Sequence, residues 1–474
     1  MNNVRGGSFQ GNFGFFLFLG FILFCFMFGG GARADAQSQI IIRSLAVIMG
    51  AVALIRFWPI NLAPIRFPLL FLGACLLLMA IQLVPLPPAL WLILPGRELF
   101  GQIAPLTGIE QPWRPISLTP DATLNSALAT LPAFAALLCF SAVSRAHYFR
   151  VLVALVALIL LSGVLGLLQV STLSSSLYFY DVTNANSAVG VFANRNHQAA
   201  FLAMLLPILA AVAAYPNSDI SVRFRTAMAI FSGLFILPLI LVTGSRTGLV
   251  LMAVGVVVGI ALWRSMPKSG SERVKGKSKR LPRLPFDIPY KGWILVVLGA
   301  VVVTLPILFS RAVSVQRLFA KDIEADYRIR LFWPMVDIFR EFFPFGSGFG
   351  SFADIFRIFE PSSNLALQYF NHAHNDALEI LIEGGVFSLA AAIIFIVWWV
   401  LSARLLWATE RKAPQALVGR LGCSMTLMLL LASLSDYPVR TPLGAVMFVL
   451  GCSFMCVGKN GIKATHRKDI EVVH

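Results

Sequence analysis

The chain has 474 residues, of which 58% are hydrophobic and only 13% are charged. With a mean hydropathy of +0.80, this composition excludes an ordinary soluble domain and indicates a helical protein that crosses a membrane several times. The formal net charge of +16 would by itself suggest a nucleic-acid partner. The basic residues lie mostly in short gaps between apolar runs, however, so we expect no nucleic acid.

About twelve apolar runs are long enough to span a bilayer, and they predict an all-α, polytopic membrane protein of about twelve transmembrane helices. The first run has an alternative interpretation. Ala32-Arg33-Ala34-Asp35-Ala36 resembles a cleavage site after a signal peptide, so this run is either retained or removed. The runs are centred near residues 12–30, 40–58, 67–84, 124–142, 151–170, 197–215, 227–243, 248–263, 292–309, 378–402, 419–435 and 442–457.

The loops between these runs form two alternating sets that differ in positive charge. One set contains both ends of the chain and the segment 264–291, in which Lys and Arg are concentrated. The other set, which includes 85–123 and 310–376, carries fewer basic residues. Because cytoplasmic loops retain the positive charge, we predict that both termini and 264–291 are cytoplasmic. The segment 371–376 then faces outward.

Two outward loops, 85–123 and 310–376, are long enough to fold. In the second loop, apolar residues recur at helical spacing over about 324–343, which predicts an amphipathic helix on or over the membrane. The turn-rich segment 344–350 ends this helix. We divide the chain into residues 1–309 with the first nine helices, 310–376 with the partly helical outer loop, and 377–474 with the last three helices and a cytoplasmic tail.

Titratable groups crowd the mouth of an apolar run in the segment 371–379. Polar groups beside a membrane helix are costly to place and are usually functional. A neutral imidazole can take a proton from an attacking hydroxyl near pH 7, so His374 is the candidate general base. His372 is assigned a supporting role. In the alternative interpretation, His372 and His374 cap a helix and hydrogen-bond the loop. Asn375 is a good N-cap for a helix that begins at this point.

Three acidic residues that follow are spaced to share one helix face: Asp376, Glu379 and Glu383. Glu383 lies about two turns into the span, where an acid must face protein or water rather than lipid. We expect this face to orient a histidine or an arginine. A purely structural polar contact is equally consistent with the sequence.

Four arginines lie on the predicted outer side, against the general charge bias. A guanidinium group is suited to binding a phosphate or diphosphate through paired hydrogen bonds. Any one of them could instead be an arginine at the membrane interface whose head reaches water. Together with a candidate base, they indicate a site for an anionic substrate. These residues are Arg195, Arg246, Arg328 and Arg330.

The sequence predicts no metal and no cofactor. The acidic residues in 322–326 alternate by twos, and that spacing does not converge in a helix. All six cysteines lie in apolar runs, which indicates buried thiols rather than disulfides or metal ligands. The chain contains no fingerprint of a nucleotide-binding loop.

Four segments, in this order and on these sides, resemble the O-antigen ligase and polymerase superfamily of bacterial envelope enzymes. The resemblance implies a GT-C-like fold in the bacterial inner membrane, with an active site that faces the periplasm. It also implies metal-independent, inverting transfer of a glycan from undecaprenyl diphosphate. His374 would deprotonate the acceptor hydroxyl, and the outer arginines would hold the diphosphate. The four segments are 192–197, 244–248, 328–352 and 374–387.

The resemblance leaves the acceptor open. Ligation of O-antigen to lipid A-core is placed first, because it follows the broad family label. Polymerisation of O-antigen or exopolysaccharide and O-glycosylation of proteins would use the same groups. A lipid-glycan transporter is an alternative from a different class, but it predicts ionisable residues near the midplanes of several spans.

Overall fold

The computed structural model describes residues 2–172, 175–216, 218–265, 323–362, 370–409 and 414–473. Over these ranges the chain is helical apart from loops and one antiparallel pair of two-residue strands, β1 (Pro85–Leu86) and β2 (Arg114–Pro115). The helices are α1 (Asn2–Phe28), α2 (Gln37–Arg56), α3 (Arg66–Gln82), α4 (Pro88–Trp91), α5 (Glu98–Gly101), α6 (Ile103–Thr107), α7 (Pro120–Leu128), α8 (Leu131–Ser141), α9 (Tyr148–Thr172), α10 (Arg195–Ala203), α11 (Leu205–Ala214), α12 (Val222–Val242), α13 (Arg246–Arg264), α16 (Ile323–Phe342), α17 (Phe352–Phe359), α18 (Asp376–Ala408), α19 (Pro414–Ser433) and α20 (Pro442–Val473).

Ten helical segments in the described ranges are long and apolar enough to cross a membrane. They correspond to ten of the predicted runs. An eleventh run, near 67–84, forms the shorter apolar helix α3, and the run 292–309 lies outside the described residues. The prediction of an all-α polytopic membrane protein is confirmed.

The centre of the bundle is formed by α11, α19 and α20, whose side chains are mostly buried. Helices farther out expose apolar side chains such as Ile48, Leu161 and Val257, as expected for surfaces that face lipid. Small residues let the central helices approach closely. A Cβ atom added to Gly422 of α19 would clash with the carbonyl oxygen of Gly451 of α20.

The first apolar run is packed into the bundle as α1. Phe18, Phe21 and Cys25 are buried in the main hydrophobic core, where α1 meets α2, α8 and α20. The chain just after α1 is also tied to the last long helix, because the N–H of Leu443 donates to the carbonyl oxygen of Gly29 at 2.9 Å. The end of α1 and the start of α20 therefore lie together.

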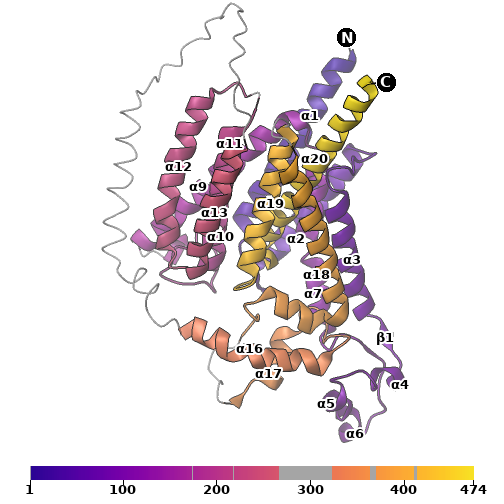
Figure 1. Cartoon of the computed structure of the whole chain (residues 1–474). Coiled ribbons are helices and arrows are strands. Elements are labelled where there is room, and N and C mark those ends of the chain that lie inside the picture. The colour runs from indigo at the N-terminus through magenta and orange to yellow at the C-terminus, as the bar shows by residue number, and fades with distance from the viewer. Residues whose placement is uncertain are drawn as a thin grey trace, which may run out of the picture.

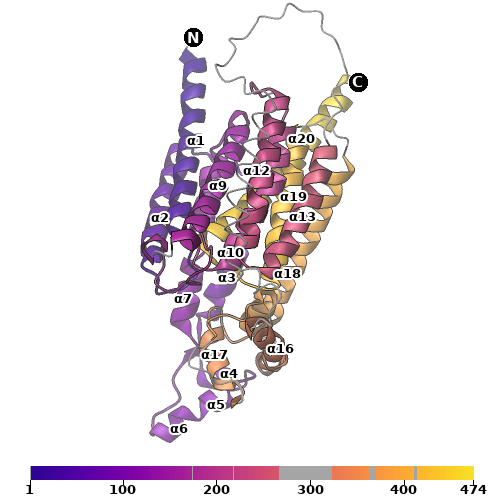
Figure 2. The same ribbon diagram turned by 90° about the vertical axis from the view of Figure 1, so that its left-hand side faces the viewer.

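Helices α16 and α17 lie across one end of the bundle, and both chain termini lie at the other end (Figure 1). The view in Figure 2 shows that α5 and α6 project beyond α17 at the same end. The predicted amphipathic helix is confirmed as α16. Leu331, Met335 and Ile338 are buried in a second hydrophobic cluster with α17 and the start of α18. Phe332, which we expected on the apolar face, lies with Trp333 on the exposed side.

The turn-rich segment 344–350 is docked on a break in α18. Gly385 has a φ of 56°, a left-handed value that interrupts the helix and that glycine adopts most easily. A Cβ atom at Gly385 would clash with the carbonyl oxygen of Pro344. The N–H of Gly348 donates to the carbonyl oxygen of Glu383 at 2.9 Å, just before the break. This contact fixes the outer helices against the first turns of α18.

Candidate active site

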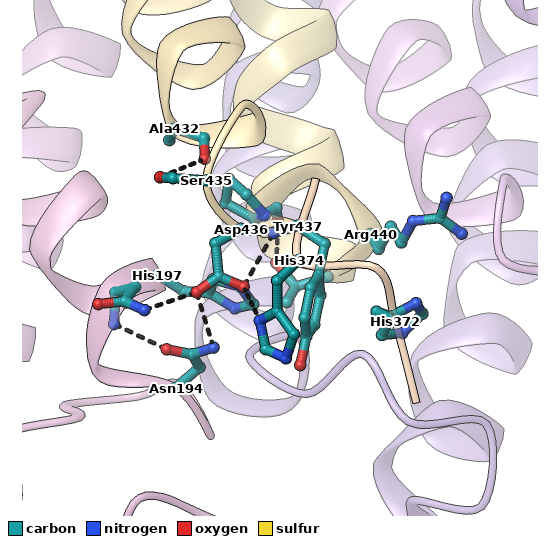
Figure 3. Close-up of polar contacts among 12 residues, drawn as sticks. Asn194, His197, His372, His374, Ala432, Ser435, Asp436, Tyr437 and Arg440 are labelled. Carbon is teal, nitrogen blue, oxygen red and sulfur yellow. Dashed lines mark hydrogen bonds and ion pairs between the residues drawn. The ribbon is translucent and has the colours of Figure 1, made fainter. Parts of the chain in front are cut away.

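A polar cluster lies at the end of the bundle that carries α16 and α17. It is built from the start of α10, the residues that precede α18 and the turn 434–441 between α19 and α20 (Figure 3). Helices α10 and α18 each begin after an asparagine N-cap. The side chain of Asn194 accepts from the N–H of Asn196, and that of Asn375 accepts from the N–H of Leu378. The predicted cap at Asn375 is confirmed.

Asp436 is the centre of this cluster, and its buried carboxylate collects donors from distant parts of the chain (Figure 3). Its Oδ2 accepts from the side-chain amides of Asn194 at 3.2 Å and Asn196 at 2.7 Å. Its Oδ1 lies 3.5 Å from Nε2 of His197 and 3.3 Å from Nδ1 of His374. One carboxylate thus joins the start of α10 to the loop before α18.

The surroundings keep Asp436 ionised. Burial acts to raise the pKa of this carboxyl, but the neighbouring imidazoles of His197 and His374 outweigh burial and leave its pKa well below its usual range. Burial and the charge of Asp436 raise the pKa of the neighbouring Tyr437, so this phenol stays neutral. The turn therefore presents a fixed anion beside a neutral ring.

His374 is held in an unusual backbone conformation. Its φ of 50° lies in the left-handed region, which non-glycine residues seldom adopt and which is often found at functional sites. Its ring lies 5.1 Å from the ring of Tyr437, centroid to centroid. The side chain is 19% exposed, whereas Asp436 is 2% exposed. The imidazole is thus anchored on a buried group and still reaches the surface.

The acidic face predicted for α18 converges on Arg440. The Nε atom of Arg440 lies 2.7 Å from Asp376, and its Nη1 lies 3.1 Å from Glu379. Its Nη2 lies 3.6 Å from Glu383. Burial acts to lower the pKa of Arg440, but these carboxylates outweigh it and raise the pKa. Glu379 also lies 2.8 Å from Nδ1 of His372, so this face holds both an arginine and a histidine.

Two of the four predicted arginines border the cluster. Arg195 is the first residue of α10, between the two asparagines that bind Asp436. Arg246 is exposed and is the first residue of α13. Its neighbour Thr247 hydrogen-bonds Ser435 at 2.8 Å, and Ser435 directly precedes Asp436.

The other two predicted arginines lie in α16. Arg330 is exposed, and the side chain of Arg328 lies outside the described residues. Because α16 packs against α18, both positions are at the same end of the molecule as His374. The structure thus gathers all four positions at one end and places Arg195 and Arg246 next to residues that contact the cluster.

Sequence reasoning missed His197, Asp436, Tyr437 and Arg440 as site residues. The turn 435–440 places an acid, a phenol and an arginine in a short connection between two long apolar runs. That crowding of polar groups is the same signal that identified the histidines, and it was available in the sequence. The sequence could not show which residues contact them, because those partners lie on other helices.

In the described part of the chain, no group of three or more His, Cys, Asp or Glu side chains is arranged to hold a metal ion. The side chains of 322–326 lie outside that part. All six cysteines are free thiols, and five of them are buried.

Residues 230–393 match the family described as O-antigen ligase. The match confirms the resemblance to the O-antigen ligase and polymerase superfamily. The matched range includes Arg246, His374 and the acidic face of α18, whereas Arg195 and Asp436 lie outside it. No curated protein matches the chain.

Proposed function

Because residues 230–393 match the O-antigen ligase family, we propose that this membrane protein transfers a glycan from undecaprenyl diphosphate to an acceptor hydroxyl. The family match supports glycosyl transfer of the ligase or polymerase type. The observation that carries the mechanism is the contact between Asp436 and His374 at the end of the bundle opposite both termini. Charge bias in the loops predicts that this end faces away from the cytoplasm. The family resemblance implies that this side is the periplasm of a bacterial cell.

In the proposed reaction, His374 is the general base. When its Nδ1–H donates to the ionised Asp436, Nε2 carries the lone pair. Nε2 takes the proton of the acceptor hydroxyl while that oxygen bonds to the anomeric carbon. The bond from this carbon to the diphosphate oxygen breaks, and its electron pair leaves with undecaprenyl diphosphate. A single displacement inverts the anomeric carbon, and the base supplies about 10² to 10⁴ in rate.

Asp436 acts as a positioning residue in this scheme. It fixes the tautomer and the orientation of His374, and Asn194, Asn196 and His197 fix Asp436 in turn. These groups lie at the start of α10, whereas Asp436 lies in the turn after α19. The orientation of His374 therefore depends on the packing of the bundle. The lowered pKa of Asp436 keeps its carboxylate charged near neutral pH.

The leaving diphosphate would be held by the outer arginines. Arg195 and Arg246 each begin a helix, where the partial positive charge of the helix N-terminus also favours an anion. Arg328 and Arg330 would approach from α16. Losing one such group is expected to cost on the order of 10² to 10³ in rate, by analogy with an oxyanion donor. The proposal assigns no metal, because these cations neutralise the diphosphate.

The acceptor is proposed to be lipid A-core. The family description as O-antigen ligase favours it over a growing polymer or a protein. Exposed apolar side chains at the outer end, including Trp333 of α16 and Leu106 of α6, offer a surface that an amphiphilic acceptor could approach.

Deletion of the gene, followed by separate sizing of carrier-linked and surface glycan, tests the assignment. Long chains that accumulate on the lipid carrier, with none on lipid A, would establish ligation. Single repeats on the carrier and loss of long chains would establish polymerisation instead. If neither pool changes, glycosyl transfer is excluded for those glycans.

Substitution of the candidate base separates an enzyme from a transporter. We expect His374→Gln to abolish transfer while donor binding persists. The matched control is His147→Gln, because His147 hydrogen-bonds Ser144 and Asn12, and Asn12 lies in the N-terminal half of α1. A transporter with a structural histidine would lose both binding and transfer in the His374 variant, or neither.

A further inference from the structure

His372 repeats the arrangement of His374 two positions earlier in the chain. Its Nδ1 lies 2.8 Å from Glu379, as Nδ1 of His374 lies 3.3 Å from Asp436. The imidazoles are 17% and 19% exposed, whereas both carboxylates are buried. Both rings contact Tyr437, at centroid distances of 4.2 and 5.1 Å. Two carboxylate-anchored imidazoles therefore share one site.

Glu379 is firmly held, so it fixes the ring of His372. Its Oε2 accepts from the N–H of Ala373 at 2.7 Å, and its Oε1 lies 3.1 Å from Nη1 of Arg440. In the part of the chain that the structure describes, His372 uses Nδ1 for its one hydrogen bond, and Nε2 makes none. The ring is thus anchored on one side and presents a nitrogen at the partly exposed side.

The two anchoring carboxylates have different partners. Glu379, which anchors His372, also contacts Arg440, and Arg440 in turn lies next to Asp376 and Glu383. The ring of Tyr437 lies against both imidazoles. The buried carboxylate of Glu379, 2.8 Å from Nδ1, stabilises a positive imidazolium at His372. His374 faces the single carboxylate of Asp436, which neutral amides also bind.

We propose that His372 is a substrate-binding residue whose protonated imidazole donates a hydrogen bond from Nε2 to the diphosphate of the lipid donor. The inference rests on the proposed function and divides the work between the two histidines. His374 removes the acceptor proton, and the electron pair of the broken bond goes to the diphosphate oxygen. His372 keeps its proton and stabilises that oxygen, so the reaction balances without a further proton.

Binding of a donor analogue tests this role separately from transfer. The probe is undecaprenyl diphosphate capped with one N-acetylglucosamine, titrated against the purified protein in lipid nanodiscs at about pH 6 and about pH 8. The cap keeps the charge of the probe constant between these values. We expect wild-type affinity to fall about tenfold from the lower to the higher pH, because a charge-assisted hydrogen bond is lost. His372→Gln should bind about tenfold more weakly at the lower pH and equally at both.

Matched variants keep the result interpretable. His147→Gln should bind like the wild type, and His374→Gln should keep a difference in affinity between the two pH values. Glu379→Gln, which preserves shape but removes the anchoring charge, should lower affinity at the lower pH. Thermal unfolding midpoints near that of the wild type would show that the variants are folded. Wild-type affinity in His372→Gln at both pH values overturns the inference alone, whereas absence of wild-type binding overturns the proposed function as well.

Discussion

The Oδ1 atom of Asp436 lies 3.3 Å from Nδ1 of His374, and this contact joins the turn after α19 to the residue before the cap of α18. The same oxygen lies 3.5 Å from Nε2 of His197 in α10. Helices α10, α18 and α19 must therefore be packed correctly before the candidate base is oriented. This dependence links the stability of the bundle to the proposed chemistry.

Asp436→Asn should lower transfer by about 10² to 10⁴, because the neutral amide cannot stabilise an imidazolium on His374. The measurement is the rate of glycan transfer from a lipid-linked donor by the purified protein. Asp354→Asn is the matched control, since Asp354 is exposed in α17 and pairs only locally with Arg357. Equal rates for Asp436→Asn and the control would remove Asp436 from the mechanism.

The same carboxylate predicts how stability depends on pH. Because the native pKa of Asp436 is lowered, its charge stabilises the fold above the ordinary aspartate value of about 4. That contribution is lost as pH falls through the lower native pKa. The difference in unfolding free energy between wild type and Asp436→Asn should thus be constant from neutral pH to about pH 5 and shrink below about pH 4. A difference that grows with acidification would contradict this prediction.

Arg440→Gln should destabilise the protein by about 3 to 5 kcal/mol, because it leaves three largely buried carboxylates without their cation. The thermal unfolding midpoint in nanodiscs reports this loss. Arg340→Gln is the control, because the ion pair that it removes, with Asp337, is exposed. Its loss of unfolding free energy should stay below about 1 kcal/mol. Similar midpoints for the two variants would show that Arg440 is not a structural centre.

Gly385→Ala should distort the start of α18 and reduce transfer. The added Cβ would clash with Pro344, and the left-handed φ of 56° would cost about 1 kcal/mol or more in addition. Gly73→Ala in α3 is the control, because a Cβ there meets nothing within 4 Å and alanine favours a helix. If Gly385→Ala retained full activity, the docking of 344–350 on the broken helix would be irrelevant to the site.

Local patterns predicted much of the architecture. Apolar length identified the ten long helices found in the described ranges, because a bilayer demands runs of that length. Helical spacing predicted α16, and the type of residue predicted the cap at Asn375. These features depend on neighbours along the chain, so they are readable without tertiary structure.

The sequence by itself determined a multi-pass helical protein, His374 as candidate base and a shared acidic face on α18. Only the tertiary structure decided that His374 meets Asp436 and that this face meets Arg440. Both partners come from a turn that follows a later helix, so no local spacing relates them to the histidine segment. Their contacts form because the central helices α19 and α20 pack tightly beside α10 and α18. Packing brings distant polar groups together in a membrane protein, where buried charges must find partners.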